Sequence, residues 1–275
     1  MSPTWDSKEP LEQDRISPLG WVRACLRGLV LGTVVFGGLG LLLLVRLIER
    51  PLCGVDRPVT PYITQGVCRS AFAILGMALL VRGPRMKARG AVVANHSSWL
   101  DIFALNARKN VYFVSKSEVA SWPGIGWLAR ATGTVFIRRD PRDVREQVAL
   151  FEERLQHGHR LLFFPEGTST DGQRVLSFKP TLFAPFFSDS LVHDMRIQPV
   201  TVIYHPPDGT DPRFYGWWGD MGFGDHLLRV LAQRPQGKVE LVYHPPVRVD
   251  EFPNRKSLAS HLEAQVRSAH SRRIE

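Results

Sequence analysis

The most prominent hydrophobic pattern along the chain is an uninterrupted apolar segment. Residues Gly28 to Val45 carry no charge, while Arg23 and Arg27 precede them and Arg46 and Arg50 follow. As an α-helix the segment would be about 27 Å long, near the thickness of a bilayer's hydrocarbon core. Its internal glycines weaken a helix in water but are common in membrane helices. The pattern favours a membrane-inserted helix over a buried helix of a soluble core, and arginines on both flanks leave its orientation open.

A second apolar stretch, Ala71 to Val81, is too short to span a bilayer alone. We expect it to be a re-entrant or interfacial partner of the first. Residues 1–20 mix charges and prolines with few large apolar side chains, which is typical of a flexible lead-in. The predicted organisation is therefore a lead-in over 1–20, membrane-associated helices over 21–85 and a catalytic domain over 86–275.

From Gly90 onward, short apolar runs alternate with stretches of helical periodicity, which predicts an α/β fold with a mixed sheet flanked by helices. One helix is well signalled, with Asp140 as N-cap, Pro141 at its first position and an end near Gly158. Another is predicted over Ser257 to Ala269. The expected strands are Ala91–Ala94, Val111–Val114, Thr134–Ile137, Leu161–Phe164, Val200–Tyr204 and Val239–Tyr243.

Composition narrows the range of partners. The 275 residues are 44% hydrophobic, enough for one sizeable core, and 35 basic against 26 acidic side chains give a net charge of +9. That charge attracts anionic partners. No basic run with interleaved aromatics is present, so a membrane surface is favoured over nucleic acid. The three cysteines, Cys25, Cys53 and Cys68, form no disulfide framework and no metal-binding spacing.

The strongest chemical motif is the sequence Asn-His-Ser-Ser-Trp-Leu-Asp at residues 95–101, which follows a predicted strand and precedes a predicted helix. The spacing of five between His96 and Asp101 lets the carboxylate reach the imidazole. A carboxylate on one ring nitrogen raises the basicity of the other, as a general base acting on an alcohol requires. Because a thioester is already activated, direct attack by a hydroxyl needs no protein nucleophile. An isolated His and Asp at this spacing would more often serve a structural turn, so the neighbouring motifs matter.

Three further blocks accompany this motif. A strand ends in Phe-Pro-Glu-Gly-Thr, with Glu166, Gly167 and Thr168 in a turn where α/β folds place ligands. Arg138 and Arg139 follow another strand, and their planar guanidinium groups suit phosphate or carboxylate. The fourth block, Ile197 to Val200, opens the next strand and is structural on its own. Each block alone also fits an ordinary turn or solvated strand end.

Together, the four blocks resemble the glycerolipid acyltransferase family typified by 1-acylglycerol-3-phosphate acyltransferases, in the family's order over roughly residues 90 to 205. The resemblance implies that His96 and Asp101 form a charge relay without a metal or other cofactor. It also implies that Arg138, Arg139 and the turn at residues 166–168 bind a lysolipid acceptor. The donor would be an acyl carrier protein or coenzyme A thioester, and the N-terminal helices would dock on a membrane. The expected location is the bacterial inner membrane, with the catalytic domain cytoplasmic.

The sequence departs from phosphatidate-forming members at one informative position. Those members usually carry arginine after the Glu-Gly-Thr turn, whereas Ser169 stands here. Lys179 and Pro180 replace a more usual basic pair, and residues 213–221 form a distinctive aromatic segment. These features are similar to the bacterial lyso-ornithine lipid acyltransferase branch. Lyso-ornithine lipid is therefore the expected acceptor, and 1-acylglycerol-3-phosphate the alternative.

Three other classes of protein share single features with this sequence. A serine esterase is disfavoured because the chain lacks a Gly-x-Ser-x-Gly elbow. A metal-dependent phosphohydrolase would need a second cluster of ligands beside His96 and Asp101, and the sequence shows none with suitable spacing. A membrane-anchored binding module without catalysis fits the charge and the apolar segment equally well, so only loss of acyl transfer in a His96→Ala variant separates it from an enzyme.

Overall fold

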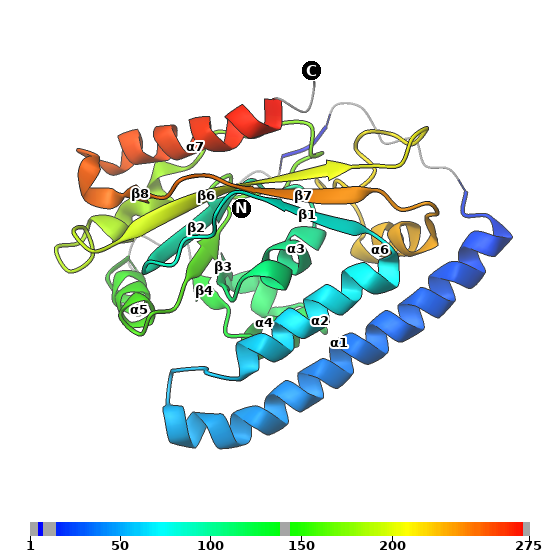
Figure 1. Cartoon of the computed structure of the whole chain (residues 1–275), viewed down its shortest axis with the longest axis horizontal. Coiled ribbons are helices and arrows are strands. Elements are labelled where there is room, and N and C mark those ends of the chain that lie inside the picture. Colours follow the sequence, from blue (N-terminus) through cyan, green and yellow to red (C-terminus); the bar gives the residue numbers. More distant parts are fainter. Residues whose placement is uncertain (1–4, 8–14, 138–143, 272–275) are drawn as a thin grey trace.

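The fold is built around one mixed, twisted sheet covered by helices on both faces (Figure 1). The computed structural model describes residues 5–7, 15–137 and 144–271. Over these residues the strand order is β1-β7-β6-β2-β5-β3-β4, with β8 paired to β6. The strands are β1 (Ala78–Arg82), β2 (Gly90–Ala94), β3 (Tyr112–Lys116), β4 (Val135–Ile137), β5 (Leu161–Phe163), β6 (Arg196–His205), β7 (Lys238–Tyr243) and β8 (Val247–Arg248). The predicted α/β class with a mixed sheet is confirmed.

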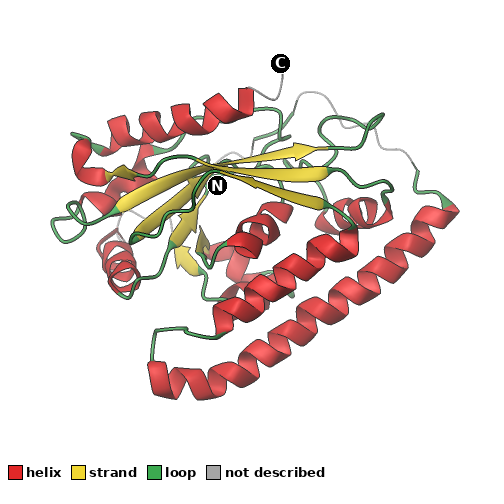
Figure 2. Cartoon of the chain, viewed as in Figure 1, coloured by secondary structure: helices red, strands yellow, loops and turns green. Residues whose placement is uncertain are grey.

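The helices separate into two layers. Helix α7 lies on one face of the sheet, and α1, α2, α3 and α6 lie on the other (Figure 1). Figure 2 shows the same arrangement by secondary structure, with short loops joining most elements. The α-helices are α1 (Pro18–Cys53), α2 (Thr60–Leu75), α3 (Leu100–Arg108), α4 (Ile125–Ala131), α5 (Val144–Gln156), α6 (Phe223–Ala232) and α7 (Arg255–Ser271). The 3₁₀ helices are η1 (Ser117–Ser121), η3 (Pro180–Phe187) and η4 (Val249–Glu251).

The direction of the strands determines which loops lie close together in the fold. Strand β2 runs parallel to both β5 and β6, and β3 runs parallel to β5 and β4. Their carboxyl ends therefore meet at one edge of the sheet, which is where ligands bind in open α/β sheets. Strand β7 is antiparallel to β6, and β1 is parallel to β7. The central strand β2 is buried along its whole length, which explains its continuous apolar sequence.

The core forms on both sides of this sheet because side chains alternate along each strand. From β2, Val92 and Ala94 join the cluster that includes α2, α3 and α6, whereas Ala91 and Val93 join the cluster under α5 and α7. Leu258, Leu262 and Val266, which follow each other at helical spacing in the predicted C-terminal helix, are fully buried, and that helix is confirmed as α7. The predicted helix start at residues 140 and 141 lies outside the described residues, and α5 is described from Val144.

Helix α1 contains the long apolar segment predicted from the sequence. It begins directly after its N-cap residue Ser17, whose Oγ accepts a 3.1 Å hydrogen bond from the Gly20 N–H. Its most apolar window has a mean hydropathy of 2.4 and is only 11% buried, so by length and composition the helix is able to cross a membrane. Near its start, Arg27 donates hydrogen bonds to the carbonyl oxygens of Leu231 and Gln233 at the end of α6. The first part of α1 is thereby fastened to the end of α6.

The second apolar stretch differs from the expectation. Helix α2 ends at Leu75 because Gly76 adopts a left-handed conformation with φ of 73°, and β1 begins at Ala78. Ala71 to Val81 is therefore not one continuous segment, because its last four residues belong to an edge strand paired to β7. Its association with a membrane stays a prediction. The sheet thus begins upstream of residue 86, where the catalytic domain was expected to start.

Candidate active site

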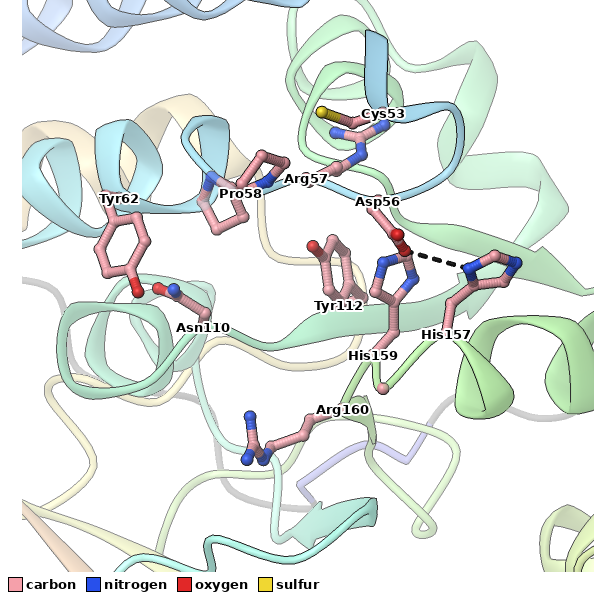
Figure 3. Close-up of a pocket in the computed structure, with 12 residues that line it drawn as sticks. Cys53, Asp56, Arg57, Pro58, Tyr62, Asn110, Tyr112, His157, His159 and Arg160 are labelled. Atoms are coloured by element: carbon pink, nitrogen blue, oxygen red, sulfur yellow. Dashed lines mark hydrogen bonds and ion pairs between the residues drawn. The ribbon is translucent and has the colours of Figure 1, made fainter. Parts of the chain in front are cut away.

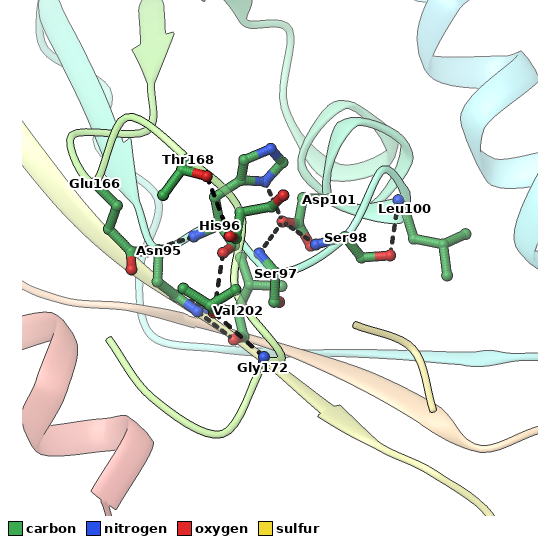
Figure 4. A network of polar contacts seen from close by, with 12 residues as sticks. Asn95, His96, Ser97, Ser98, Leu100, Asp101, Glu166, Thr168, Gly172 and Val202 are labelled. Carbon is green, nitrogen blue, oxygen red and sulfur yellow. Dashed lines mark hydrogen bonds and ion pairs between the residues drawn. The ribbon is translucent and has the colours of Figure 1, made fainter. Parts of the chain in front are cut away.

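The motif residues gather at the edge formed by the carboxyl ends of the parallel strands. A cavity of about 540 Å³ lies at the opposite edge, beside the α1–α2 turn, and none of the motif residues that the structure describes lines it (Figure 3). The polar network around His96 instead joins the loop after β2, the turn after β5 and the end of β6 (Figure 4). Because β2 is hydrogen-bonded to both β5 and β6, these three segments are held side by side.

The predicted pair of His96 and Asp101 is in direct contact. The Nδ1 of His96 lies 2.7 Å from Oδ2 of Asp101. The carboxylate is fully buried, while the imidazole is 20% exposed. With Nδ1 donating to the carboxylate, the lone pair stays on Nε2, which is the tautomer that a general base needs. Asp101 lies in the first turn of α3, where the helix dipole favours a negative charge.

Asp101 is held by several donors. Its Oδ2 also accepts hydrogen bonds from the backbone N–H groups of Ser97 at 2.9 Å and Ser98 at 3.1 Å. Its Oδ1 accepts a 2.6 Å bond from the hydroxyl of Tyr204 at the end of β6. Burial, and then the nearby Asp101 carboxylate, raise the pKa of Tyr204 well above its usual value, so this hydroxyl stays a donor. The donors stabilise a buried negative charge that would otherwise be costly.

The imidazole of His96 is also fixed by stacking. Its ring lies on the ring of Phe164 at 4.0 Å between centroids, with the planes only 11° apart. Phe164 follows β5 directly, so the turn after β5 sets the face of the histidine ring. The loop itself is held by Asn95, whose amide group exchanges two hydrogen bonds with the backbone of Val202 on β6. The imidazole of His96 is therefore held in position before a substrate binds.

The buried side chain of Glu166 connects two loops through its carboxylate oxygens. One carboxylate oxygen accepts a 2.7 Å hydrogen bond from the His96 N–H, and the other accepts a 2.6 Å bond from the Leu176 N–H. Burial raises the pKa of Glu166 to about 8, an effect that these two backbone bonds oppose and the charge of Asp101 reinforces. The side chain links the histidine loop to the turn after β5. The acceptor-binding role expected of Glu166 stays a prediction.

The rest of the predicted turn lies beside Glu166. Gly167 has a φ of 74°, a conformation that glycine adopts without strain, and its N–H closes the turn on the carbonyl oxygen of Phe164. The hydroxyl of Thr168 accepts a 3.4 Å hydrogen bond from the Trp5 N–H, so part of the expected lead-in lies against the turn. Arg138 and Arg139 lie outside the described residues. Strand β4 ends at Ile137, directly before them.

Several residues that shape the site were not predicted. The sequence pattern identifies Tyr204 only as the end of a strand, although a phenol at the carboxyl end of a buried strand is a signal that could have found it. The indole N–H of Trp99 donates a 2.8 Å hydrogen bond to Nδ1 of His226, and burial lowers the pKa of His226 to about 4, which keeps it a neutral acceptor. The backbone N–H of Trp217 donates a 2.8 Å hydrogen bond to the carbonyl oxygen of Ser97. The distinctive aromatic segment therefore helps to position the loop that contains His96.

Comparison with known proteins defines the class of this chain. Residues 80–203 match the model of the family described as Acyltransferase. The chain is 58% identical to a lyso-ornithine lipid O-acyltransferase of Rhodobacter capsulatus, over 98% of both proteins. It is 40% identical to a 1-acyl-sn-glycerol-3-phosphate acyltransferase of Neisseria meningitidis, over 60% of this chain and 64% of that protein. The chain therefore belongs to the acyltransferase family.

A solved structure supports the same fold. The crystal structure of the 1-acyl-sn-glycerophosphate acyltransferase PlsC from Thermotoga maritima superposes with a TM-score of 0.62 at 24% identity, over 92% of this chain and 94% of that one. At this identity the likeness defines the fold. The family membership shows that the protein is an enzyme that transfers acyl groups, acts on lipids and associates with membranes.

Proposed function

We propose that this enzyme transfers a fatty acyl chain from a thioester to the free hydroxyl of lyso-ornithine lipid, the last acylation in forming an ornithine lipid. The observation that carries the proposal is the 58% identity to the lyso-ornithine lipid O-acyltransferase of Rhodobacter capsulatus over nearly the full length of both chains. A second protein of that name, from Rhizobium meliloti, is 32% identical over 93% of this chain. The donor is acyl carrier protein or coenzyme A carrying the acyl group.

The proposed chemistry follows from the His96–Asp101 geometry. Nε2 of His96 takes the proton of the acceptor hydroxyl as its oxygen attacks the thioester carbonyl carbon. The Asp101 carboxylate, held by the N–H of Ser97 and the hydroxyl of Tyr204, stabilises the imidazolium that forms. When the tetrahedral intermediate collapses, the carbon–sulfur bond breaks and the imidazolium returns its proton to the leaving thiolate. No covalent acyl-enzyme is required.

The proposed acceptor site includes the turn after β5, which lies next to His96. Arg138 and Arg139 are suited to the ornithine carboxylate by their planar donors. Gly167 and Thr168 would face the acceptor from the turn after β5, and Glu166 would act mainly by fixing that turn to the His96 loop. This division of roles refines the expectation from the sequence, in which the whole turn bound the acceptor.

The second candidate is 1-acylglycerol-3-phosphate acylation, supported by the 40% identity to the Neisseria meningitidis enzyme over 60% of this chain. Both acceptors present a free hydroxyl and a headgroup that contains an anionic group, a carboxylate in one and a phosphate in the other, so the same base serves either reaction. For both, the proposed location is the bacterial inner membrane with the catalytic domain on the cytoplasmic side, where acyl carrier protein and coenzyme A are found.

A side-by-side assay tests the proposal. Purified protein in detergent is given acyl-carrier-protein or coenzyme A thioesters with either lyso-ornithine lipid or lysophosphatidate. The expected result is a higher kcat/KM for lyso-ornithine lipid, with either thioester. A His96→Ala variant should lose about 100-fold to 10,000-fold in kcat, the usual contribution of general-base catalysis. A preference for lysophosphatidate would assign the alternative, and near-normal turnover by the variant would remove His96 from the mechanism.

A further inference from the structure

The cavity at the opposite edge of the sheet plays no part in this chemistry. Its wall on one side is the α1–α2 turn, including Cys53 and Arg57, and on the other the segments that enter β3 and β5 (Figure 3). Strand β5 leads away from the cavity toward the turn that contains Glu166. The cavity therefore lies at the amino end of β5 and the His96 network at its carboxyl end, so a ligand in the cavity does not reach the acyl-transfer centre.

Buried hydrogen-bonding groups next to the cavity lack partners. His159 is only 6% exposed, and both ring nitrogens are buried without a hydrogen-bond partner among the described residues. The Nε of Arg160 is buried and unpartnered in the same way. A neutral imidazole always carries one N–H, and the guanidinium Nε always carries a hydrogen. Because leaving such donors unsatisfied is unfavourable, they indicate that an acceptor from outside the chain completes the site.

The positive charge around the cavity favours an anionic ligand. The cations near His159 are Arg154, Arg57 and, when protonated, His157, and Asp56 is the acid that faces it. Asp56 already contacts His157, with Oδ1 3.0 Å from Nδ1. Burial, reinforced by Arg154, lowers the pKa of His159 to about 4. An oxyanion with several acceptor oxygens, such as a phosphate group, would satisfy the donors and balance the charge.

The surroundings of the cavity are apolar on the side of α1. Immediately before Cys53, helix α1 exposes Leu47, Ile48 and Leu52, which are 73%, 67% and 78% accessible. Tyr62, on the opposite side of the turn, is 64% accessible. A basic cavity next to an exposed apolar strip, on the helix through which a membrane enzyme meets the bilayer, matches a phosphate group attached to acyl chains.

We propose that this cavity binds the headgroup phosphate of an anionic phospholipid of the bilayer, with its acyl chains against the exposed end of α1. The bound lipid is neither donor nor acceptor of the reaction. It fastens the α1–α2 turn to the membrane at one point, and so fixes the orientation of the catalytic domain relative to the leaflet.

The first test compares two variants of equal charge. The double variant His159→Phe, Arg160→Gln removes the unpartnered donors but keeps a ring that stacks on Tyr112. The control, Arg255→Gln, removes one exposed positive charge from the start of α7. Binding is measured to phosphatidylcholine vesicles with and without phosphatidylglycerol. The preference for phosphatidylglycerol should fall about tenfold in the double variant alone, since charge-assisted hydrogen bonds are lost there. An equal fall in the control would overturn the proposal, because the attraction would then be general.

The second test separates a lipid from a free phosphate and does not depend on the double variant folding. Dihexanoyl-phosphatidylglycerol below its critical micelle concentration and glycerol phosphate are each titrated into the wild type, His96→Ala and Arg160→Gln, and the thermal midpoint is followed. The lipid should raise the midpoint of the wild type and His96→Ala at lower concentration than glycerol phosphate, and the rise should be lost in Arg160→Gln. Equal potency of the two ligands would exclude a lipid site, and no rise with either would exclude an anion site.

Discussion

The hydroxyl of Tyr204 donates a 2.6 Å hydrogen bond to Oδ1 of Asp101. This contact joins the end of β6 to the carboxylate that orients His96, and it was not foreseen from the sequence. Tyr204 is buried, and its ring packs against that of Tyr215 at 5.5 Å between centroids. The hydroxyl can therefore be removed while the ring and its packing remain, which makes the contribution of the hydrogen bond measurable.

In Tyr204→Phe we expect kcat to fall about tenfold. A hydrogen bond to a charged group is worth about 1.5 to 3 kcal/mol, and only part of this free energy stabilises the transition state more than the bound substrate. KM for the acceptor should change little, since Tyr204 is buried behind Asp101. Steady-state kinetics with circular dichroism as a folding control would measure this. An unchanged kcat in the folded variant would show that the hydroxyl serves only the packing of β6.

The second prediction concerns the pH dependence of stability. Burial raises the pKa of Glu166 from 4.5 to about 8, so between these values the folded protein holds a proton that the unfolded chain releases. The contribution of Glu166 is thus fully present below about 4.5 and is lost as pH rises through about 8. In Glu166→Gln, which is neutral at every pH, the thermal midpoint should decline less over this range than in the wild type. Parallel curves for the two proteins would contradict the raised pKa.

The sequence specified the site better than it specified the elements around it. His96 and Asp101 were predicted because both lie in one short loop, so spacing alone brings them together. Tyr204 reaches Asp101 only through the pairing of β2 with β6, a contact 103 residues apart that no local pattern encodes. The division of residues 71–81 between a helix and a strand escaped the sequence pattern for a similar reason. A short apolar run fits a helix and a buried or edge strand equally well, and the turn at Gly76 decided between them.

The third prediction addresses membrane attachment. Deleting residues 1–50 would uncover part of the core, because Ala24 and Leu31 of α1 are buried in it. Substitution on the outer face is cleaner: Leu44 and Leu47 are 64% and 73% exposed. Burying one leucine is worth about 1.5 to 3 kcal/mol, so Leu44→Ser with Leu47→Ser should weaken vesicle binding by at least about tenfold. Methionine at both positions, which preserves apolarity, is the control. Undiminished binding of the serine variant would mean that this face does not contact lipid.

The last prediction concerns the acceptor, at the position where phosphatidate-forming relatives usually carry arginine. Ser169 is half-buried, and its carbonyl oxygen accepts a 3.4 Å hydrogen bond from the Thr168 hydroxyl, so the residue belongs to the turn beside His96. An arginine there would add planar donors for a phosphate group. Because a hydrogen bond to a charged group is worth about 1.5 to 3 kcal/mol, the gain in affinity for a phosphate acceptor should be roughly tenfold to a hundredfold.

We therefore expect Ser169→Arg to raise the kcat/KM for lysophosphatidate relative to that for lyso-ornithine lipid. Ser169→Gln, similar in length but uncharged, separates the effect of charge from that of size. The ornithine carboxylate is also anionic, and Arg138 and Arg139 would still serve either headgroup, so both activities should remain measurable. Specificity is a difference of affinities, and the ratio of the two kcat/KM values reports that difference directly. A ratio that moves toward lyso-ornithine lipid, or that moves equally in the glutamine variant, would show that residue 169 does not select the acceptor by charge.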